Sequence, residues 1–160
     1  MLLARTRLLV ATLWAGSIWT VGYLAAPTLF ATLSDRVLAG NIAANLFAHQ
    51  AWLSMACALV MLALLWVGRG SETGGIFAGS AANSAARTRR VLLIIVAIML
   101  ACTLIMHFGL QPIMAGLRAT AGPGGVMEGA AHNEFGILHG ISSSLYLVQS
   151  LLAAWLVIKQ

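Results

Sequence analysis

Charged side chains are scarce in this sequence. Only 8% of its 160 residues are charged, while 61% are hydrophobic. A soluble domain carries about 25% charged residues, because its surface faces water. The mean hydropathy of +0.93 points the same way. These values exclude a water-soluble domain and predict a chain that lies in a lipid bilayer.

Cysteines and acids are also rare. Cys57 and Cys102 lie deep in apolar runs, without the close spacing of a zinc or redox motif, so we expect buried thiols. All four acids fall in the expected loops or at helix ends: Asp35, Glu72, Glu128 and Glu134. This argues against a proton-coupled pump that uses a buried carboxylate. The nine basic residues are too few and too scattered for a nucleic-acid partner.

Long apolar runs take the place of charge. A bilayer core about 30 Å thick needs roughly 20 apolar residues in a helix, since the backbone must satisfy its own hydrogen bonds there. Four segments meet this requirement, at about 8–33, 42–68, 91–113 and 135–158. The sequence therefore predicts an all-α integral membrane bundle of four transmembrane helices, as one domain over residues 1–160.

The segments between these helices carry their own signals. Residues 69–90 are rich in Gly, Ser and Ala and predict a flexible, hydrated link. The Gly-Pro-Gly-Gly run at 122–125 cannot continue a helix. Asp35 is expected to cap a short helical run that lies at the interface or extends the second helix, and Asn133 to cap the fourth. Pro27 is expected to bend the first helix.

The positions of Lys and Arg predict the orientation, because positively charged loops stay in the cytoplasm. Only Arg36 and Arg118 fall on one side of the expected membrane. Seven basic residues fall on the other side: Arg5, Arg7, Arg69, Arg87, Arg89, Arg90 and Lys159. We therefore expect an inner (cell) membrane protein with both termini in the cytoplasm. The first apolar run is too long for a cleaved signal peptide.

Two helices show faces suited to packing. In the first, Ala11, Ala15, Gly22 and Ala26 share one side and would let a neighbouring helix approach closely. In the fourth, small and polar residues share the side of His139 and are expected to face the bundle: Gly136, Ser142, Ser143, Tyr146, Ser150, Ala153 and Ala154. Apolar residues on the opposite side are expected to face lipid: Ile141, Leu145, Val148, Leu151, Leu152 and Trp155.

Three histidines, His49, His107 and His139, lie inside apolar segments at matching depths near the outer face. An ionisable group in a membrane is by default a functional hypothesis. One interpretation makes them candidate ligands of haem iron or copper, with auxiliary methionines such as Met106, Met114 or Met127. The other has neutral imidazoles that hydrogen-bond to neighbouring helices. We favour the second, because no HxxxH, HExxH or CxxC pair fixes two ligands on one helix.

Two stretches of the chain resemble a known family. They run from Trp14-Ala-Gly-Ser through Val21-Gly-Tyr-Leu-Ala-Ala-Pro-Thr-Leu-Phe30 to Ala39-Gly40 and Leu46-Phe47, and then over Phe135-Gly-Ile-Leu-His-Gly-Ile-Ser-Ser-Ser-Leu-Tyr146. These stretches resemble the transmembrane protein 205-like family, which includes bacterial members of unknown function. The resemblance implies a four-helix membrane protein with no settled activity. Of the three histidines, only His139 lies within the matching stretches.

We therefore expect a small non-enzymatic membrane protein without catalytic residues or a cofactor. Its partners would be the lipid bilayer and either a second copy or another membrane protein. The alternative is a haem- or copper-binding membrane protein that uses the three histidines. A third, weaker interpretation is a small-solute transporter that works as a homo-oligomer, since four helices alone enclose little pathway.

Overall fold

The computed structural model describes residues 2–68, 79–120 and 129–160. Within these ranges the chain is helical apart from short connections. The described residues form four helices long and apolar enough to cross a membrane: Leu2–Thr32, Arg36–Val67, Asn83–Ala119 and Gly129–Ile158. The prediction of an all-α protein with four spans is confirmed.

Two of the four spans contain a π-helical segment. The first span consists of α1 (Leu2–Trp19), η1 (Thr20–Ala25) and α2 (Ala26–Thr32). The third consists of α4 (Gly79–Leu104), η3 (Ile105–Leu110) and α5 (Gln111–Ala119). The second and fourth spans are the single helices α3 (Arg36–Val67) and α6 (Gly129–Ile158).

The π segments precede the two prolines of these spans. A proline in a helix lacks an N–H group, and its ring clashes with the carbonyl four residues earlier. For Pro27 that carbonyl belongs to Tyr23 in η1, and for Pro112 it belongs to Phe108 in η3. The wider π turn makes hydrogen bonds to the fifth residue back and so accommodates the ring. The disturbance expected at Pro27 is therefore a π turn, which recurs at Pro112.

Helix boundaries differ from the predictions in two places. Residues 79–90 are helical, so the predicted flexible link is wrong for that part, while 69–78 lie outside the described residues. Within this extension, Arg89 Nε donates to the carbonyl of Leu65 at 2.9 Å, which satisfies a carbonyl at the end of α3. Helix α6 begins at Gly129, so Asn133 lies inside the helix and the prediction that it caps is wrong.

The predicted cap at Asp35 is confirmed. Its Oδ1 accepts hydrogen bonds from the backbone N–H groups of Val37 and Leu38, at 2.9 and 3.0 Å. Helix α3 then runs without a break from Arg36, so the short run after Asp35 extends the second span. The Gly-Pro-Gly-Gly run at 122–125 lies outside the described residues.

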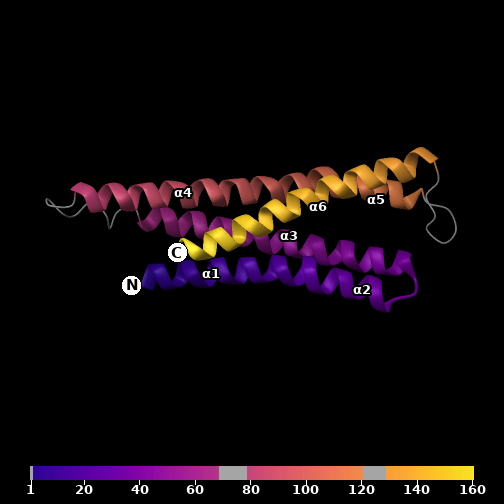
Figure 1. Cartoon of the computed structure of the whole chain (residues 1–160), viewed down its shortest axis with the longest axis horizontal. Helices are drawn as coiled ribbons and strands as arrows, with labels where there is room; N and C mark the ends of the chain where they lie inside the picture. Colours follow the sequence, from indigo (N-terminus) through magenta and orange to yellow (C-terminus); the bar gives the residue numbers. More distant parts are fainter. Residues whose placement is uncertain (1, 69–78, 121–128) are drawn as a thin grey trace.

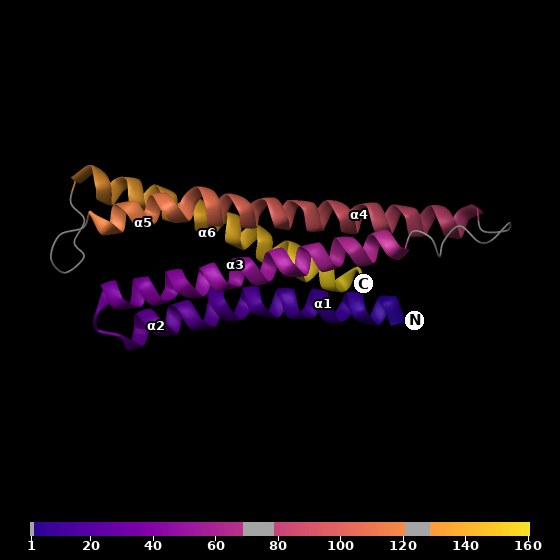
Figure 2. The same ribbon diagram turned by 180° about the vertical axis from the view of Figure 1, so that it is seen from behind.

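The bundle has two unlike halves (Figures 1 and 2). Both termini lie at one end, and we call the half near them the terminal half and the other the open half. In the terminal half α1, α3, α4 and α6 pack on one another. Helix α6 then runs obliquely away from the first span, so that in the open half α2 packs on α3 and α5 packs on α6. Backbone contacts between these two pairs are sparse.

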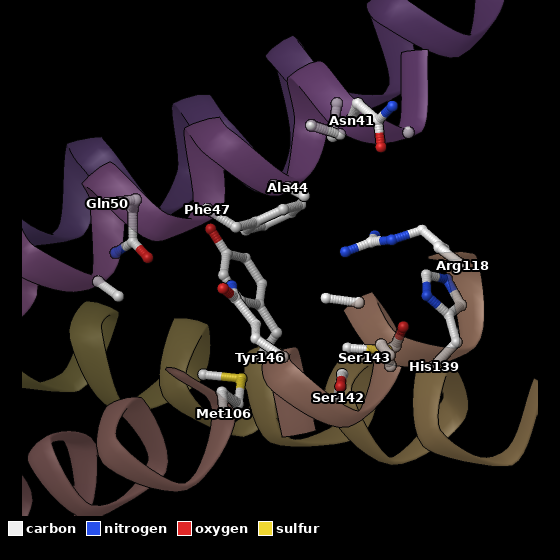
Figure 3. A pocket seen from close by; sticks show the side chains of 18 of the residues that line it. Asn41, Ala44, Phe47, Gln50, Met106, Arg118, His139, Ser142, Ser143 and Tyr146 are labelled. Atoms are coloured by element: carbon white, nitrogen blue, oxygen red, sulfur yellow. The ribbon is translucent and has the colours of Figure 1, made fainter. Parts of the chain in front are cut away.

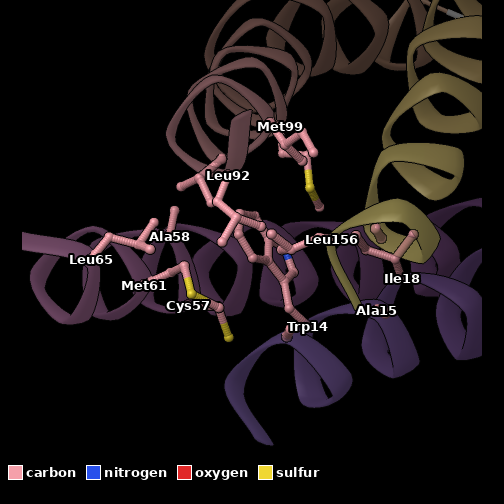
Figure 4. Packing of buried hydrophobic residues seen from close by; sticks show 14 residues of the cluster. Trp14, Ala15, Ile18, Cys57, Ala58, Met61, Leu65, Leu92, Met99 and Leu156 are labelled. Atoms are coloured by element: carbon pink, nitrogen blue, oxygen red, sulfur yellow. The ribbon is translucent and has the colours of Figure 1, made fainter. Parts of the chain in front are cut away.

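The terminal half holds the apolar core (Figure 4). Its largest side chains are fully buried and come from all four spans: Trp14, Ile18, Met61, Leu65, Met99 and Leu156. Cys57 and Cys102 are both buried and free, as the sequence predicted. Tight van der Waals packing of this kind holds membrane helices together, because lipid provides no hydrophobic drive between them.

A layer of side-chain hydrogen bonds separates this core from the open half. Ser54 Oγ accepts from Trp14 Nε1 at 2.9 Å and from Gln50 Nε2 at 2.7 Å, which links α1 to α3. Between α4 and α6, Gln149 Nε2 donates to Thr103 Oγ1 at 2.8 Å. We call these five residues the polar layer. It connects the four spans in two pairs at mid-bundle, α1 with α3 and α4 with α6.

Helix α6 is also tied to the first span at this level. Trp19 Nε1 donates to Ser150 Oγ at 2.9 Å, and the Tyr146 hydroxyl donates to the carbonyl of Ile18 at 2.6 Å. A Cβ atom on Gly22 would overlap the ring of Tyr146, so only glycine allows this approach. The predicted small-residue face of the first helix is confirmed.

Candidate functional site

The open half contains a cavity of about 1040 Å³ between the α2–α3 pair and the α5–α6 pair. Figure 3 shows it from close by, with side chains from α3, α5 and α6 pointing into it. A smaller hollow of about 390 Å³, between α3 and the η3–α5 segment, shares Ala44, His107 and Arg118 with it. The cavity with its side hollow is called the crevice below.

The crevice exists because small side chains face one another across separated helices. Gly40, Ala43 and Ala44 line it from α3, and Ser142 and Ser143 line it from α6. Small residues at a close helix contact would let the backbones touch. Here the helix pairs diverge, so the same small side chains leave the space between them unfilled.

The floor of the crevice is formed by polar groups that already have partners. Gln50 and Thr103 belong to the polar layer, and Tyr146 bonds to Ile18. Thr103 Oγ1 donates to the carbonyl of Met99 at 2.9 Å while it accepts from Gln149. These groups close the crevice toward the terminal half.

The walls are largely apolar. They include aromatic, methionine and leucine side chains, with at least one from every span: Tyr23, Phe30, Phe47, Met106, Met114 and Leu147. Tyr146 stands between Phe47 and Tyr23, with edge-to-face ring centroids 5.3 and 6.3 Å away. Such surfaces suit hydrocarbon or an aromatic ring.

Two polar atoms in the walls are buried without a hydrogen-bond partner among the described residues. They are Nδ1 of His107 and Oγ of Ser142, and both residues line the crevice. The ring of His107 meets Phe108 at 4.7 Å and Trp52 at 5.6 Å between centroids. A buried polar group without a partner costs free energy, so each offers a bonding position to a guest or a water molecule.

The structure places the three candidate histidines in different surroundings. His107 and His139 line the crevice, and the ring of His139 stacks on Phe135 with centroids 6.2 Å apart. His49 is exposed, is bonded through Nδ1 to the carbonyl of Asn45 at 2.8 Å, and does not line the crevice. Thr103, Gln111 and Met114, which share one side of the third span with His107, also line the crevice.

In the described part of the chain, the three histidines do not come together as a metal site. Among residues 2–68, 79–120 and 129–160, no group of three or more His, Cys, Asp or Glu side chains could hold a metal ion. Met106 and Met114 line the crevice beside His107, and Met127 lies outside the described residues. Haem or copper binding by the histidines stays a prediction.

Two arginines stand at the mouth of the crevice. Arg36 is the first residue of α3, and Arg118 lies in the last turn of α5. Both line the crevice, and Figure 3 shows Arg118 and His139 pointing into it from α5 and α6. The described lining residues include no aspartate or glutamate. The mouth is therefore positively charged.

These arginines were not predicted to belong to a site. In the sequence, Arg36 and Arg118 were only the minority on the less positive side of the membrane. That position was itself the available signal, because arginines against the charge bias call for another explanation. Gln149, which is fully buried and donates to Thr103 on α4, was not predicted either.

Comparison with known proteins gives one match. The family described as Domain of unknown function (DUF4149) matches residues 9–123. No curated protein and no solved structure matches the chain. The matched region contains Arg36, His107 and Arg118, while His139 and the rest of α6 lie beyond it. The resemblance to the transmembrane protein 205-like family stays a prediction.

Proposed function

Because this chain belongs to the DUF4149 family, whose function is unknown, we propose its function from its geometry. It is a non-enzymatic protein of the inner (cell) membrane, with both termini in the cytoplasm. Its terminal half anchors the bundle, and its open half takes up one amphiphilic guest molecule from the bilayer.

The crevice is the observation that supports this proposal. Binding pockets for small molecules measure roughly 300–1,000 Å³, and the main cavity of the crevice, at about 1040 Å³, is slightly larger than that range. Its apolar walls suit a hydrocarbon portion, and its polar mouth suits a head group. Because the helix pairs diverge, a guest can enter sideways from the lipid.

The chemistry of the lining favours binding over catalysis. The described lining residues contribute no carboxylate and no thiol. Ser142 Oγ has no hydrogen-bond partner among the described residues that could act as a base. A serine without a base is a weak nucleophile. The lining therefore supports a role in holding a molecule.

Blocking the crevice tests the proposal. Ser143 lines it, whereas its neighbour Ser144 donates to the carbonyl of Gly140 and lies outside the lining. We expect Ser143→Trp to weaken binding of a fluorescent phosphatidylcholine at least about tenfold, which is a loss of about 1.4 kcal/mol. Ser144→Trp adds the same bulk elsewhere and should bind like the wild type. Equal binding by both variants would contradict the proposal.

The orientation is tested by reporter fusions. With both termini in the cytoplasm, a reporter placed after Gln160 should read cytoplasmic. One placed after Thr120, at the end of the third span, should read external. The charge distribution of seven basic residues against two supports this orientation. The reverse pattern would turn the mouth of the crevice toward the cytoplasm.

A further inference from the structure

We infer that the guest of the crevice is an anionic amphiphile, and that Arg118 and Arg36 bind its negatively charged head group. The inference rests on the proposed function, since it names the chemistry of the molecule that the crevice holds. A phosphate or a carboxylate would provide the charge, and a hydrocarbon chain would fill the space below it.

The charge of the lining is the first step of the argument. Its described ionic side chains are Arg36 and Arg118, with no acid among them. Asp35, beside Arg36 in the chain, uses its carboxylate to cap α3. Glu134 is exposed on α6 outside the lining. Anionic groups near the membrane surface attract arginine side chains, so an anion in the crevice would stabilise both residues.

The arrangement of the donors is the second step. A guanidinium group presents five N–H donors in a plane and binds phosphate or carboxylate in bidentate fashion. Arg36 stands on the α2–α3 side of the crevice and Arg118 on the α5–α6 side. Asn41 and His139 also line the crevice on these two sides. A head group between them would connect helix pairs that otherwise have few contacts.

Depth is the third step. Arg36 is the first residue of the second span, and Arg118 is next to the last residue of the third. Both therefore lie near the level where lipid head groups lie. Thr103 on the floor is 15 residues before Arg118, which corresponds to roughly 22 Å along the helix. The space from mouth to floor thus suits a hydrocarbon chain lying along the helices.

The polar atoms in the walls lie between these two levels. His107, four residues after Thr103, and Ser142, four residues before Tyr146, lie about one helical turn above the floor, so their Nδ1 and Oγ can bond to a water molecule or to a polar group deep in the guest. A lipid chain covers the apolar walls, whereas a free phosphate leaves them uncovered. The observations favour the lipid as the source of the anion.

The experiment compares head groups on the full chain in detergent. Phosphatidylglycerol, phosphatidylcholine and glycerol phosphate serve as the anionic lipid, the zwitterionic lipid and the free anion. We expect the wild type to prefer phosphatidylglycerol over phosphatidylcholine about tenfold, as charge-assisted hydrogen bonds allow. Arg118→Gln should remove most of the preference and leave phosphatidylcholine binding intact. Arg36→Gln should remove part of it.

Two further variants separate this role from general effects of charge. Arg87 is exposed on α4, away from the crevice, so Arg87→Gln removes the same charge and should keep the full preference. Arg118→Lys keeps the charge without the planar donors and should retain an intermediate preference. Retention of phosphatidylcholine by Arg118→Gln shows in the same assay that the variant is folded.

The outcomes distinguish the two proposals. Equal binding of both lipids by the wild type, or an unchanged preference in Arg118→Gln, overturns the anionic guest and leaves the crevice as a binding site. If Ser143→Trp binds both lipids as tightly as the wild type does, the proposed function itself is overturned. If glycerol phosphate binds as tightly as the anionic lipid, both to the wild type and to Ser143→Trp, the site binds soluble anions and the amphiphilic guest is overturned.

Discussion

The terminal half and the open half use the same four spans in opposite ways. In the terminal half, bulky side chains such as Trp14, Met61 and Met99 interdigitate and are fully buried. In the open half, residues such as Gly40, Ala44 and Ser143 face each other across a gap. Large residues fill the terminal half, and small residues leave the open half hollow. The comparison suggests that stability resides in one half and ligand binding in the other.

Removing the central tryptophan of the core is the strongest way to test this division. Trp14→Ala leaves a large hole and deprives Ser54 of a donor. We expect a loss of about 3 kcal/mol in the free energy of unfolding, measured by denaturant titration in mixed micelles. Trp155 is 48% exposed, so Trp155→Ala should cost less than about 1 kcal/mol. Similar losses would contradict a core confined to the terminal half.

The boundary between the halves is tested at Gly22. A leucine there would collide with Tyr146 and break its hydrogen bond to Ile18. We expect Gly22→Leu to lower the free energy of unfolding in detergent by about 2 kcal/mol. Leu24 is 64% exposed, so Leu24→Ala should cost much less. A Tyr146→Ala background should reduce the cost of Gly22→Leu, and an unchanged cost would show that another contact is responsible.

Substitutions in the polar layer should change the free energy of unfolding by less, and two of them should differ in the direction of the change. Thr103→Val removes the acceptor of Gln149 Nε2 and leaves that buried amide unpaired. We expect a loss of about 1 kcal/mol. Gln149→Leu instead removes both Nε2 and an Oε1 that has no partner among the described residues. It should be neutral or stabilising in the same unfolding assay, and a loss as large as that of Thr103→Val would count against this account.

The histidines should show the smallest effect on stability. The described residues give His139 a stacked ring neighbour and leave His107 Nδ1 without a partner. We expect His139→Gln and His107→Gln to cost less than about 1 kcal/mol each, in line with measured membrane hydrogen bonds. The wild type should contain no stoichiometric haem or copper by absorbance and metal analysis. A Soret band that disappears in His139→Gln would restore the haem interpretation.

The sequence predicted the spans well, because composition alone decides which segments tolerate lipid. Periodicity also placed Ser150 and Ala153 of α6 inside and Leu151 outside. Leu152 was assigned to lipid but packs partly against the core. Two helix starts were missed: the alanines and arginines within 79–90 favour a helix and extend α4 outward, and α6 begins four residues before Asn133.

The crevice could not be predicted from the sequence. A face of small residues allows close packing where two helices meet and leaves a cavity where they diverge. The sequence pattern is the same in both cases. Only the course of α6 decides between the two. The arginines at the mouth were visible in the sequence, but their convergence depends on how α3 and α5 are placed.

The π segments suggest what a single deleted residue would do. Each wide turn holds one residue more than an α-helical turn of the same extent. Removing one residue from η1 or η3 would therefore restore a regular helix and leave both flanking parts of the span facing the same way. In the third span, α4 would keep its place in the core and Arg118 would stay at the mouth, whereas a deletion in the regular part of α4 would turn Arg118 away by about 100°. A regular helix has no room for the ring of Pro112, so homologues with a one-residue gap at 105–110 should carry another residue there and keep both the terminal half and the charged mouth.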